Sequence, residues 1–209
     1  LCGLMIIGID FDNTIVSYDD VFFRAARDRG LIPDDFVPLK EEIRDALRAS
    51  GREDDWTELQ SYVYGQYIAD ASAFPGVIDF FRFARREGHA VRIISHKTER
   101  PYRGPPLDLR GAARSWLTSR RFLESAKTGL SLDVVYFEET RQDKLRRIAE
   151  CGCDMFVDDL PEFLSEPNFP QSVQRVLFDP QGRGAAPDEV VACRSWEEIR
   201  NYVLQRMTK

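Results

Sequence analysis

The 209-residue chain contains few of the residues from which zinc sites and disulfides are built. It has four cysteines and two histidines, and no two cysteines form a C-x-x-C pair. Cys151 and Cys153 flank Gly152, where we expect a helix to stop, so we interpret both thiols as small, partly buried apolar groups. The sequence therefore offers no evident zinc-binding set.

Long apolar runs and an excess of positive charge are also lacking. No apolar stretch approaches the roughly 20 residues that span a bilayer, and the start lacks the pattern of a secretory signal. The formal net charge is −6, which argues against general binding to nucleic acid because a phosphate backbone calls for a basic surface. We expect a cytoplasmic protein with neither a membrane nor a nucleic-acid partner; its oligomeric state is not predicted.

Two carboxylates follow the first apolar run of the chain. Residues 5–9 (MIIGI) predict a buried parallel strand. Asp10 and Asp12 come directly after it, at the end of the strand where open α/β sheets bind ligands. Their mutual repulsion is relieved by a divalent cation, or by a proton that makes one of them a general acid. Both conditions suit phosphoryl transfer; the alternative is that Asp10 caps the next element while Asp12 and Asn13 form a turn.

Other polar residues follow later apolar runs in the same way. Ser95 ends one run, and Asp158 and Asp159 end another. Lys144 opens a helical pattern about one helix before the acidic pair. Because parallel strands end at one edge of their sheet, these groups are expected to converge on one pocket.

Together these motifs resemble those of the haloacid dehalogenase-like (HAD) hydrolase superfamily. Its ordered motifs are D-x-D-x-T, here residues 10–14, then a strand-end Ser or Thr, a Lys, and a terminal acidic pair. The resemblance covers roughly residues 4–16 and 75–180. It implies an α/β fold with a Rossmann-like parallel sheet flanked by helices. Two departures are Asn13, where many members have Gly, and the terminal motif 158–162, which lacks a glycine.

A helical segment separates the first motif from the rest. In the family, an insertion at this point is a small helical cap, and the sequence therefore predicts a cap of residues 18–73 on a core domain of residues 1–17 and 74–209. The alternative is a helical bundle that extends the core. The helical patterns of the insert are 20–29, 39–50 and 55–72.

Further elements are expected in the core. The last helix should begin at Ser195 as N-cap, with Glu198 three residues later. This last helix is predicted over 195–207. The other predicted elements are strands at 90–94, 133–137, 154–157 and 173–178, and helices at 77–87 and 108–121.

The resemblance implies a role for each matched residue. Asp10 would attack phosphorus to form an aspartyl-phosphate, and Asp12 would protonate the leaving alkoxide and then deprotonate water. Ser95 and Lys144 would bind the transferring phosphoryl oxygens. Thr14 would complete the phosphate-binding set by fixing the loop.

The implied cofactor is Mg²⁺. It would contact Asp10, the backbone carbonyl of Asp12, and the pair Asp158 and Asp159 through oxygen atoms. The sequence does not decide which member of that pair is a direct ligand.

A loop rich in cations follows Ser95. Its proline and glycine content excludes helix and strand over residues 96–106. His96, Lys97, Arg100 and Arg103 are candidate substrate-binding residues, since such cations can bind a second anionic group of the substrate. The alternative is a solvated surface loop.

The sequence therefore predicts a Mg²⁺-dependent phosphatase that acts on a small phosphomonoester, such as a sugar phosphate or a nucleotide. The preference for small substrates follows from the expected cap. A dehalogenase of the same fold would need the nucleophile but neither Asp12 nor a cation. A non-catalytic binding or scaffold protein would be expected to have lost at least one motif.

Overall fold

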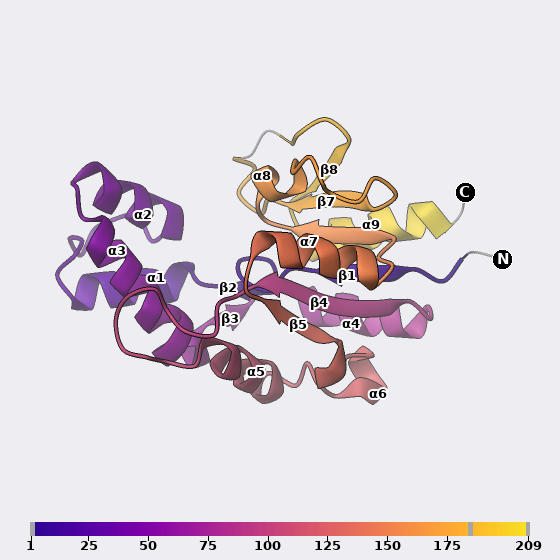
Figure 1. Cartoon of the computed structure of the whole chain (residues 1–209), viewed down its shortest axis with the longest axis horizontal. Helices are drawn as coiled ribbons and strands as arrows, with labels where there is room; N and C mark the ends of the chain where they lie inside the picture. Colours follow the sequence, from indigo (N-terminus) through magenta and orange to yellow (C-terminus); the bar gives the residue numbers. More distant parts are fainter. Residues whose placement is uncertain (1–2, 184–185, 208–209) are drawn as a thin grey trace. The chain divides into compact units, whose positions relative to one another are not determined.

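The computed structural model of the chain describes residues 3–183 and 186–207. The chain packs as two compact units, whose elements are labelled in Figure 1. The sheet unit comprises Leu1–Ile15, Ala73–His96 and Arg121–Lys209, and the helical unit comprises Val16–Ser72 and Lys97–Arg120.

The sheet unit is built on a six-stranded sheet in the order β5-β4-β1-β6-β7-β8. Each neighbouring pair is parallel, so all six carboxyl ends lie at one edge. The strands are β1 (Ile6–Ile9), β4 (Ala90–His96), β5 (Val135–Glu138), β6 (Met155–Asp158), β7 (Gln174–Phe178) and β8 (Val190–Cys193). The predicted α/β class and parallel sheet are confirmed.

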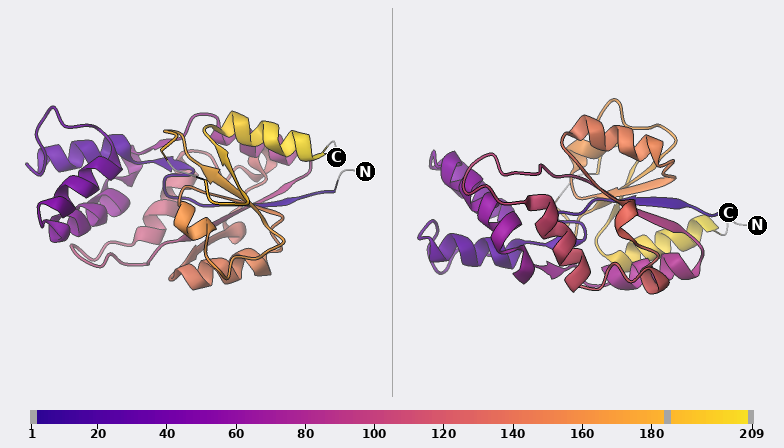
Figure 2. Two further views of the ribbon diagram at one scale, coloured as in Figure 1. Left: turned by 90° about the horizontal axis from the view of Figure 1, so that it is seen from above. Right: turned by 60° about the horizontal axis from the view of Figure 1, so that its bottom comes forward.

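Helices cover both faces of this sheet (Figure 2). On one face α4 packs against β4, α6 and α9, and α9 packs against β8. On the other face α7 packs against β4 and β5, and α8 against β6 and β7. The bounds are α4 Val77–Arg86, α6 Ser125–Thr128, α7 Arg141–Glu150, α8 Pro161–Leu164 and α9 Trp196–Met207, with a 3₁₀ turn at Leu132–Val134.

Aromatic side chains fill the core between β6 and α8. Phe156, Phe163 and Phe169 are buried, and their ring centroids lie 5.8 to 6.2 Å apart. On the other face the ring centroids of Trp196 and Phe80 lie 5.0 Å apart. Burial of such rings removes large apolar areas from water, so the ends of β1 and β6 rest on a rigid support.

Helices also make up most of the helical unit. Residues 97–120, which the predicted division assigned to the core, pack here: the indole Nε1 of Trp116 donates to the carbonyl of Ala71 at 2.9 Å. The predicted cap role of the insert stays a prediction. The elements are β2 (Val16–Ser17) paired with β3 (Ser72–Ala73), α1 (Asp19–Asp28), α2 (Lys40–Ala49), α3 (Glu53–Ser61), a π-helical turn (Tyr62–Gln66), a 3₁₀ turn (Ile68–Asp70) and α5 (Leu109–Ser119).

The helix predicted over 55–72 is interrupted after Ser61. There the backbone widens to a π-helical turn, in which the N–H of Tyr67 donates to the carbonyl of Tyr62 at 2.9 Å. A Cβ atom added to Gly65 would lie 2.6 Å from Cδ1 of Leu107. The turn therefore lies close to the loop that precedes α5. Because Gly65 and Leu107 are far apart in sequence, the helical periodicity of residues 55–72 could not predict this contact.

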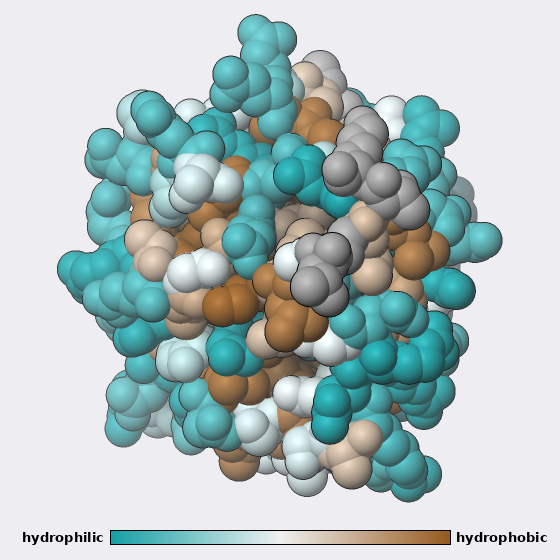
Figure 3. Space-filling model, turned by 90° about the vertical axis from the view of Figure 1, so that its right-hand side faces the viewer, coloured by the Kyte–Doolittle hydropathy of each residue, from teal (hydrophilic) through white to brown (hydrophobic). Residues whose placement is uncertain are grey.

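The molecular surface is predominantly polar on the side shown in Figure 3, where brown apolar patches lie among teal hydrophilic side chains. Over the described ranges, the large apolar side chains that are exposed are Leu4, Val37, Tyr102 and Leu132. No helix formed by residues 3–183 or 186–207 is long and apolar enough to cross a membrane.

Candidate active site

Strand register brings the first and last predicted motifs together. Ile9 of β1 pairs with Val157 of β6, so the next residues, Asp10 and Asp158, lie level where both strands end. The backbone N–H of Asp10 extends this pairing, donating to the carbonyl of Val157 at 2.9 Å. Both aspartates are buried, with exposures of 5% and 0%.

Lys144 connects these two carboxylates. It lies in the first half of α7, and its Nζ is 2.6 Å from both Oδ1 of Asp10 and Oδ2 of Asp158. Thr140 caps the helix, accepting from the N–H of Asp143 at 3.1 Å. Because α7 packs across β4 and β5, the helix delivers the ammonium to the strand ends from outside the sheet.

The lysine also lies against aromatic rings, which the motif pattern did not predict. Its Nζ is 4.1 Å from the ring centroid of Phe163 and 5.4 Å from that of Phe156. These apolar rings lower the local dielectric and strengthen the attraction between Lys144 and its carboxylates. The only signal in the sequence is the place of Phe163, four residues after the acidic pair.

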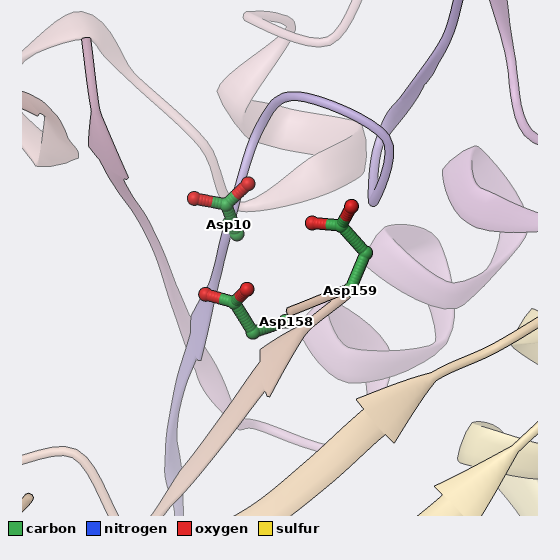
Figure 4. Close-up of side chains that lie close together, drawn as sticks. All are labelled: Asp10, Asp158 and Asp159. Carbon is green, nitrogen blue, oxygen red and sulfur yellow. The ribbon is translucent and has the colours of Figure 1, made fainter. Parts of the chain in front are cut away.

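Three carboxylates form a cluster suited to a hard cation. Ligand atoms of Asp10, Asp158 and Asp159 all lie within 4.8 Å of one another. Figure 4 shows Asp10 on the segment that leaves β1 and the other two at the end of β6. A cluster of carboxylate oxygens fits Mg²⁺, and Asp159 is less buried than its neighbour. The side chain of Asp12 is half-buried and is not part of this cluster. The predicted metal contact of Asp12 is made by its backbone carbonyl, and it stays a prediction.

Burial and charge shift the pKa values of the two central groups. Burial raises the pKa of Asp10 to about 7, with Lys144 opposing the shift and Asp158 adding to it. Burial works against the charge of Lys144, but Asp10 and Asp158 outweigh it and raise the pKa of the ammonium. The lysine therefore stays charged at neutral pH, and a divalent cation beside Asp10 would favour its ionised, nucleophilic form.

The loop after Asp10 is held at both ends. Asn13 has a φ of 58°, the left-handed conformation that Asn tolerates and most residues avoid. Thr14 is buried, its Oγ1 donates to Oδ1 of Asp159 at 3.5 Å, and its carbonyl accepts from the indole of Trp196 at 3.2 Å. The predicted role of Thr14 in the phosphate-binding set stays a prediction.

Ser95 and His96 occupy the end of β4. Ile93 pairs with Ile9, so Ser95 lies one residue beyond the level of Asp10, and it is 1% exposed. His96 is half-buried with Nε2 3.1 Å from the carbonyl oxygen of Glu139, and burial lowers its pKa. The predicted roles of both side chains, in binding phosphate and substrate respectively, stay predictions.

The predicted cationic loop divides into a buried and an exposed part. Lys97 is buried in the helical unit, with its Nζ 4.8 Å from the ring centroid of Tyr64. Arg100 and Arg103 are exposed, and Arg103 forms an ion pair with Asp54 at 3.0 Å. The predicted binding roles of the two arginines stay predictions.

Solved structures share this fold at low sequence identity. A HAD family hydrolase from Deinococcus radiodurans is 13% identical with a TM-score of 0.56, over 99% of this chain and 97% of that one. A predicted phosphatase from Clostridium acetobutylicum is 11% identical with a TM-score of 0.58, over 97% and 100%. A dehalogenase is 15% identical with a TM-score of 0.57, over 97% and 98%.

No protein-family model and no curated protein matches the sequence. At identities of 11–16%, structural likeness bears on the fold, and it agrees with the resemblance seen in the motifs. The chain has the fold of the HAD-superfamily hydrolases.

Proposed function

We propose that the protein is a Mg²⁺-dependent phosphatase that hydrolyses a small phosphomonoester through an aspartyl-phosphate. The observation that carries this proposal is the bridge from Lys144 Nζ to Asp10 and Asp158, both at 2.6 Å, inside a cluster of three carboxylates. The predicted phosphatase among the structural neighbours supports it, as does the hydrolase of Deinococcus radiodurans, whose structure contains bound phosphate and sodium.

In the first half of the reaction, Asp10 attacks phosphorus. Lys144 holds Oδ1 of Asp10, so we assign the attack to the second carboxylate oxygen. The new oxygen–phosphorus bond forms while the ester oxygen–phosphorus bond breaks, and Asp12 gives its proton to the leaving alkoxide. Lys144 and Ser95 offset the charge on the phosphoryl oxygens.

In the second half, Asp12 is a carboxylate and acts as a base. It takes a proton from water as the water oxygen attacks phosphorus and the bond to Asp10 breaks. Inorganic phosphate leaves, and the ionised Asp10 and protonated Asp12 are restored. Mg²⁺, held by Asp10, the carbonyl of Asp12, Asp158 and Asp159, would neutralise charge on the phosphate and the crowded carboxylates.

The test is hydrolysis of para-nitrophenyl phosphate and glycerol 3-phosphate, measured with Mg²⁺ and with excess chelator. Asp10→Asn keeps the shape of the side chain and removes its charge, so kcat should fall about a thousandfold or more while the melting temperature stays similar. Asp79→Asn, which changes an exposed aspartate on α4, is the matched control and should retain activity.

Undiminished turnover by folded Asp10→Asn protein, or full activity in chelator, would contradict the mechanism. A parallel assay of chloride release from 2-chloropropionate addresses the dehalogenase alternative, which a structural neighbour makes worth testing. Metal-independent chloride release without ester hydrolysis would favour that alternative.

A further inference from the structure

A guanidinium group lies one helical turn from Lys144 on α7. Arg141 precedes Lys144 by three residues, and residues with this spacing share one face of a helix. The rise over three residues is about 4.5 Å. Because β5 ends at Glu138 and α7 begins at Arg141, the arginine is the nearer of the two to the edge where the strands end. Both residues belong to the sheet unit, as does the carboxylate cluster.

The partner of Arg141 holds it loosely. Nη2 of Arg141 is 3.9 Å from Oε1 of Glu162, and the two side chains are 45% and 57% exposed. This distance is too long for a hydrogen bond, and an exposed ion pair of this kind contributes little stability. Glu162 precedes Phe163, whose ring contacts Nζ of Lys144. The Arg141–Glu162 pair therefore lies beside the buried contact of Lys144 with α8, on its solvent-exposed side.

The charge of Arg141 acts on the same ring as the charges of the candidate active site. Burial lowers the pKa of His96, and the positive charges of Lys144 and Arg141 lower it further. The charge of Asp12 raises it. Because such effects weaken with distance, these charges surround one ring at the end of β4.

This placement puts Arg141 near the variable part of a substrate. In the proposed reaction Asp12 protonates the leaving alkoxide, so the remainder of the ester extends from phosphorus past Asp12. A residue that lies near both Asp12 and Lys144 is therefore within the length of a small molecule from the reacting phosphorus. Arg141 is such a residue.

The chemistry of a guanidinium group suits a second anion at this place. The group is planar, stays charged, and can donate two parallel hydrogen bonds to a carboxylate or a phosphate. Glu162 shows that a carboxylate fits beside Arg141, but at a distance too long for these bonds. A substrate whose phosphoryl group is held at Lys144 could bring a second anion closer than Glu162.

We propose that Arg141 binds a second anionic group of the substrate, a carboxylate or a phosphate, in place of its contact with Glu162. The inference rests on the proposed phosphatase function and deepens it by naming the substrate class: a small phosphomonoester with a second negative charge. Arg141 is then a specificity residue that contacts the substrate away from the reacting group.

Three phosphate esters on one carbon frame test this proposal. Glycerol 3-phosphate has a neutral far end, 3-phosphoglycerate carries a carboxylate there, and glycerol 1,3-bisphosphate carries a second phosphate. We expect kcat/KM of the wild type to be at least about fivefold higher for one of the two anionic esters than for glycerol 3-phosphate, because a bidentate contact with an anion is a strong one. The better of the two identifies the anion.

Two variants then locate the effect. Arg141→Met keeps an apolar stem and removes the charge, so it should lower kcat/KM for the preferred anionic ester at least about fivefold more than for glycerol 3-phosphate. Glu162→Gln removes the competing carboxylate and should raise kcat/KM for the anionic ester about twofold or more. Opposite effects of the two variants distinguish substrate binding from a structural ion pair, which both variants would break.

Arg146→Met is the matched control. Arg146 lies on the same helix, is 65% exposed and pairs with Asp143. It follows Lys144 by two residues, so it lies on a different face of α7. The variant loses the same charge as Arg141→Met and should leave the ratio of kcat/KM between the esters unchanged. Melting temperatures verify that all three variants fold, as expected for exposed positions.

The outcomes separate this inference from the proposed function. Turnover of glycerol 3-phosphate without any preference for the anionic esters would overturn the inference and leave the phosphatase proposal standing. Equal losses on charged and neutral esters in Arg141→Met would also overturn it, and so would the same change of ratio in Arg146→Met. Absence of hydrolysis of every ester would instead reject the phosphatase proposal, and this inference with it.

Discussion

At the scale of single residues, Lys144 is the positive charge that balances the buried carboxylates of the candidate site. Its ammonium, 3% exposed, lies between the buried carboxylates of Asp10 and Asp158. Such a group gains little net stability from its ion pairs, since both partners lose hydration, but its removal leaves uncompensated charge. The lysine is therefore needed both by the fold and by the proposed reaction.

The variant Lys144→Met should lower the free energy of unfolding by roughly 3–5 kcal/mol, the usual cost of breaking a buried ion pair. The loss should be largest above pH 7, because the pKa of Asp10, already raised to about 7, rises further and protonation at lower pH relieves the site. Urea unfolding in chelator at pH 6 and pH 8 measures both effects.

A double-mutant cycle provides the control. In an Asp10→Asn background the buried negative charge is already reduced, so Lys144→Met should cost at least about 1 kcal/mol less than in the wild type. Equal costs in the two backgrounds would show that the lysine stabilises the fold through packing alone.

Asn13 illustrates how far the chemistry of one side chain specifies a backbone conformation. Asn13 stands where the motif pattern that the sequence resembles often has Gly, and Asn tolerates turn conformations. The φ of 58° confirms that this position requires a left-handed residue. The same reasoning predicted Gly152 as the stop of α7, and its φ is 62°.

At the scale of elements, the cap of α7 controls the position of Lys144. The lysine backbone N–H donates to the carbonyl of Thr140 at 3.1 Å, and the Thr140 hydroxyl both accepts from and donates to Asp143. We expect Thr140→Ala to cost about 1 kcal/mol in stability and to lower kcat/KM several-fold, because the first helical turn holds the lysine in place.

Two variants make this prediction specific. Thr140→Ser retains the hydroxyl and should restore most of both quantities. Asp108→Ala removes a comparable cap from α5, where Asp108 accepts from Gly111 at 2.7 Å, so it should lose similar stability with a smaller effect on kcat/KM. Identical activity losses in the two alanine variants would mean that general destabilisation explains the effect.

Elements with a strong local signal were predictable from the sequence. The N-cap of α9 is an example: Glu198 donates its N–H to Ser195 Oγ at 3.1 Å, and its carboxylate accepts from Arg194 at 2.7 Å. The strand β8, by contrast, was not predicted. It spans four residues, Val190–Cys193, and its burial depends on pairing with β7 rather than on its own alternation.

The same limit applies at the scale of the whole molecule. The ordered motifs predicted which strand ends meet, because a parallel sheet aligns them regardless of loop length. They could not predict that residues 97–120 pack with the helical unit, which depends on contacts such as Trp116 with Ala71 and Gly65 with Leu107. Such contacts join segments tens of residues apart and have no period along the chain.

A buried histidine connects the stability of the whole molecule to pH. His89 is 5% exposed, its Nδ1 accepts from the backbone N–H of Met5 at 3.2 Å, and its Nε2 has no hydrogen-bond partner among the described residues. Burial lowers its pKa, with Glu87 opposing the shift. The folded protein therefore resists protonation of this ring more than the unfolded chain does.

The sign of the effect on stability follows from this difference. Above the unfolded pKa of about 6.5 the ring is neutral in both states, and its contribution is fully present. As pH falls below that value, the unfolded chain binds the proton first and stability decreases until the folded pKa is passed. The raised pKa of Asp10 acts in the opposite direction over an overlapping range, so the wild-type profile alone does not isolate His89.

The difference in unfolding free energy between the wild type and His89→Asn isolates the contribution of His89, because Asp10 and His96 are common to both proteins. Asn carries an oxygen on Cγ, where His89 carries Nδ1, so an acceptor for Met5 is retained while the titrating ring is lost. We expect the stability advantage of the wild type over the variant, measured by urea unfolding, to shrink between pH 7 and pH 5, with a slope no steeper than about 1.4 kcal/mol per pH unit for one proton. A constant or growing advantage would show that the folded protein accommodates a charged ring at this site.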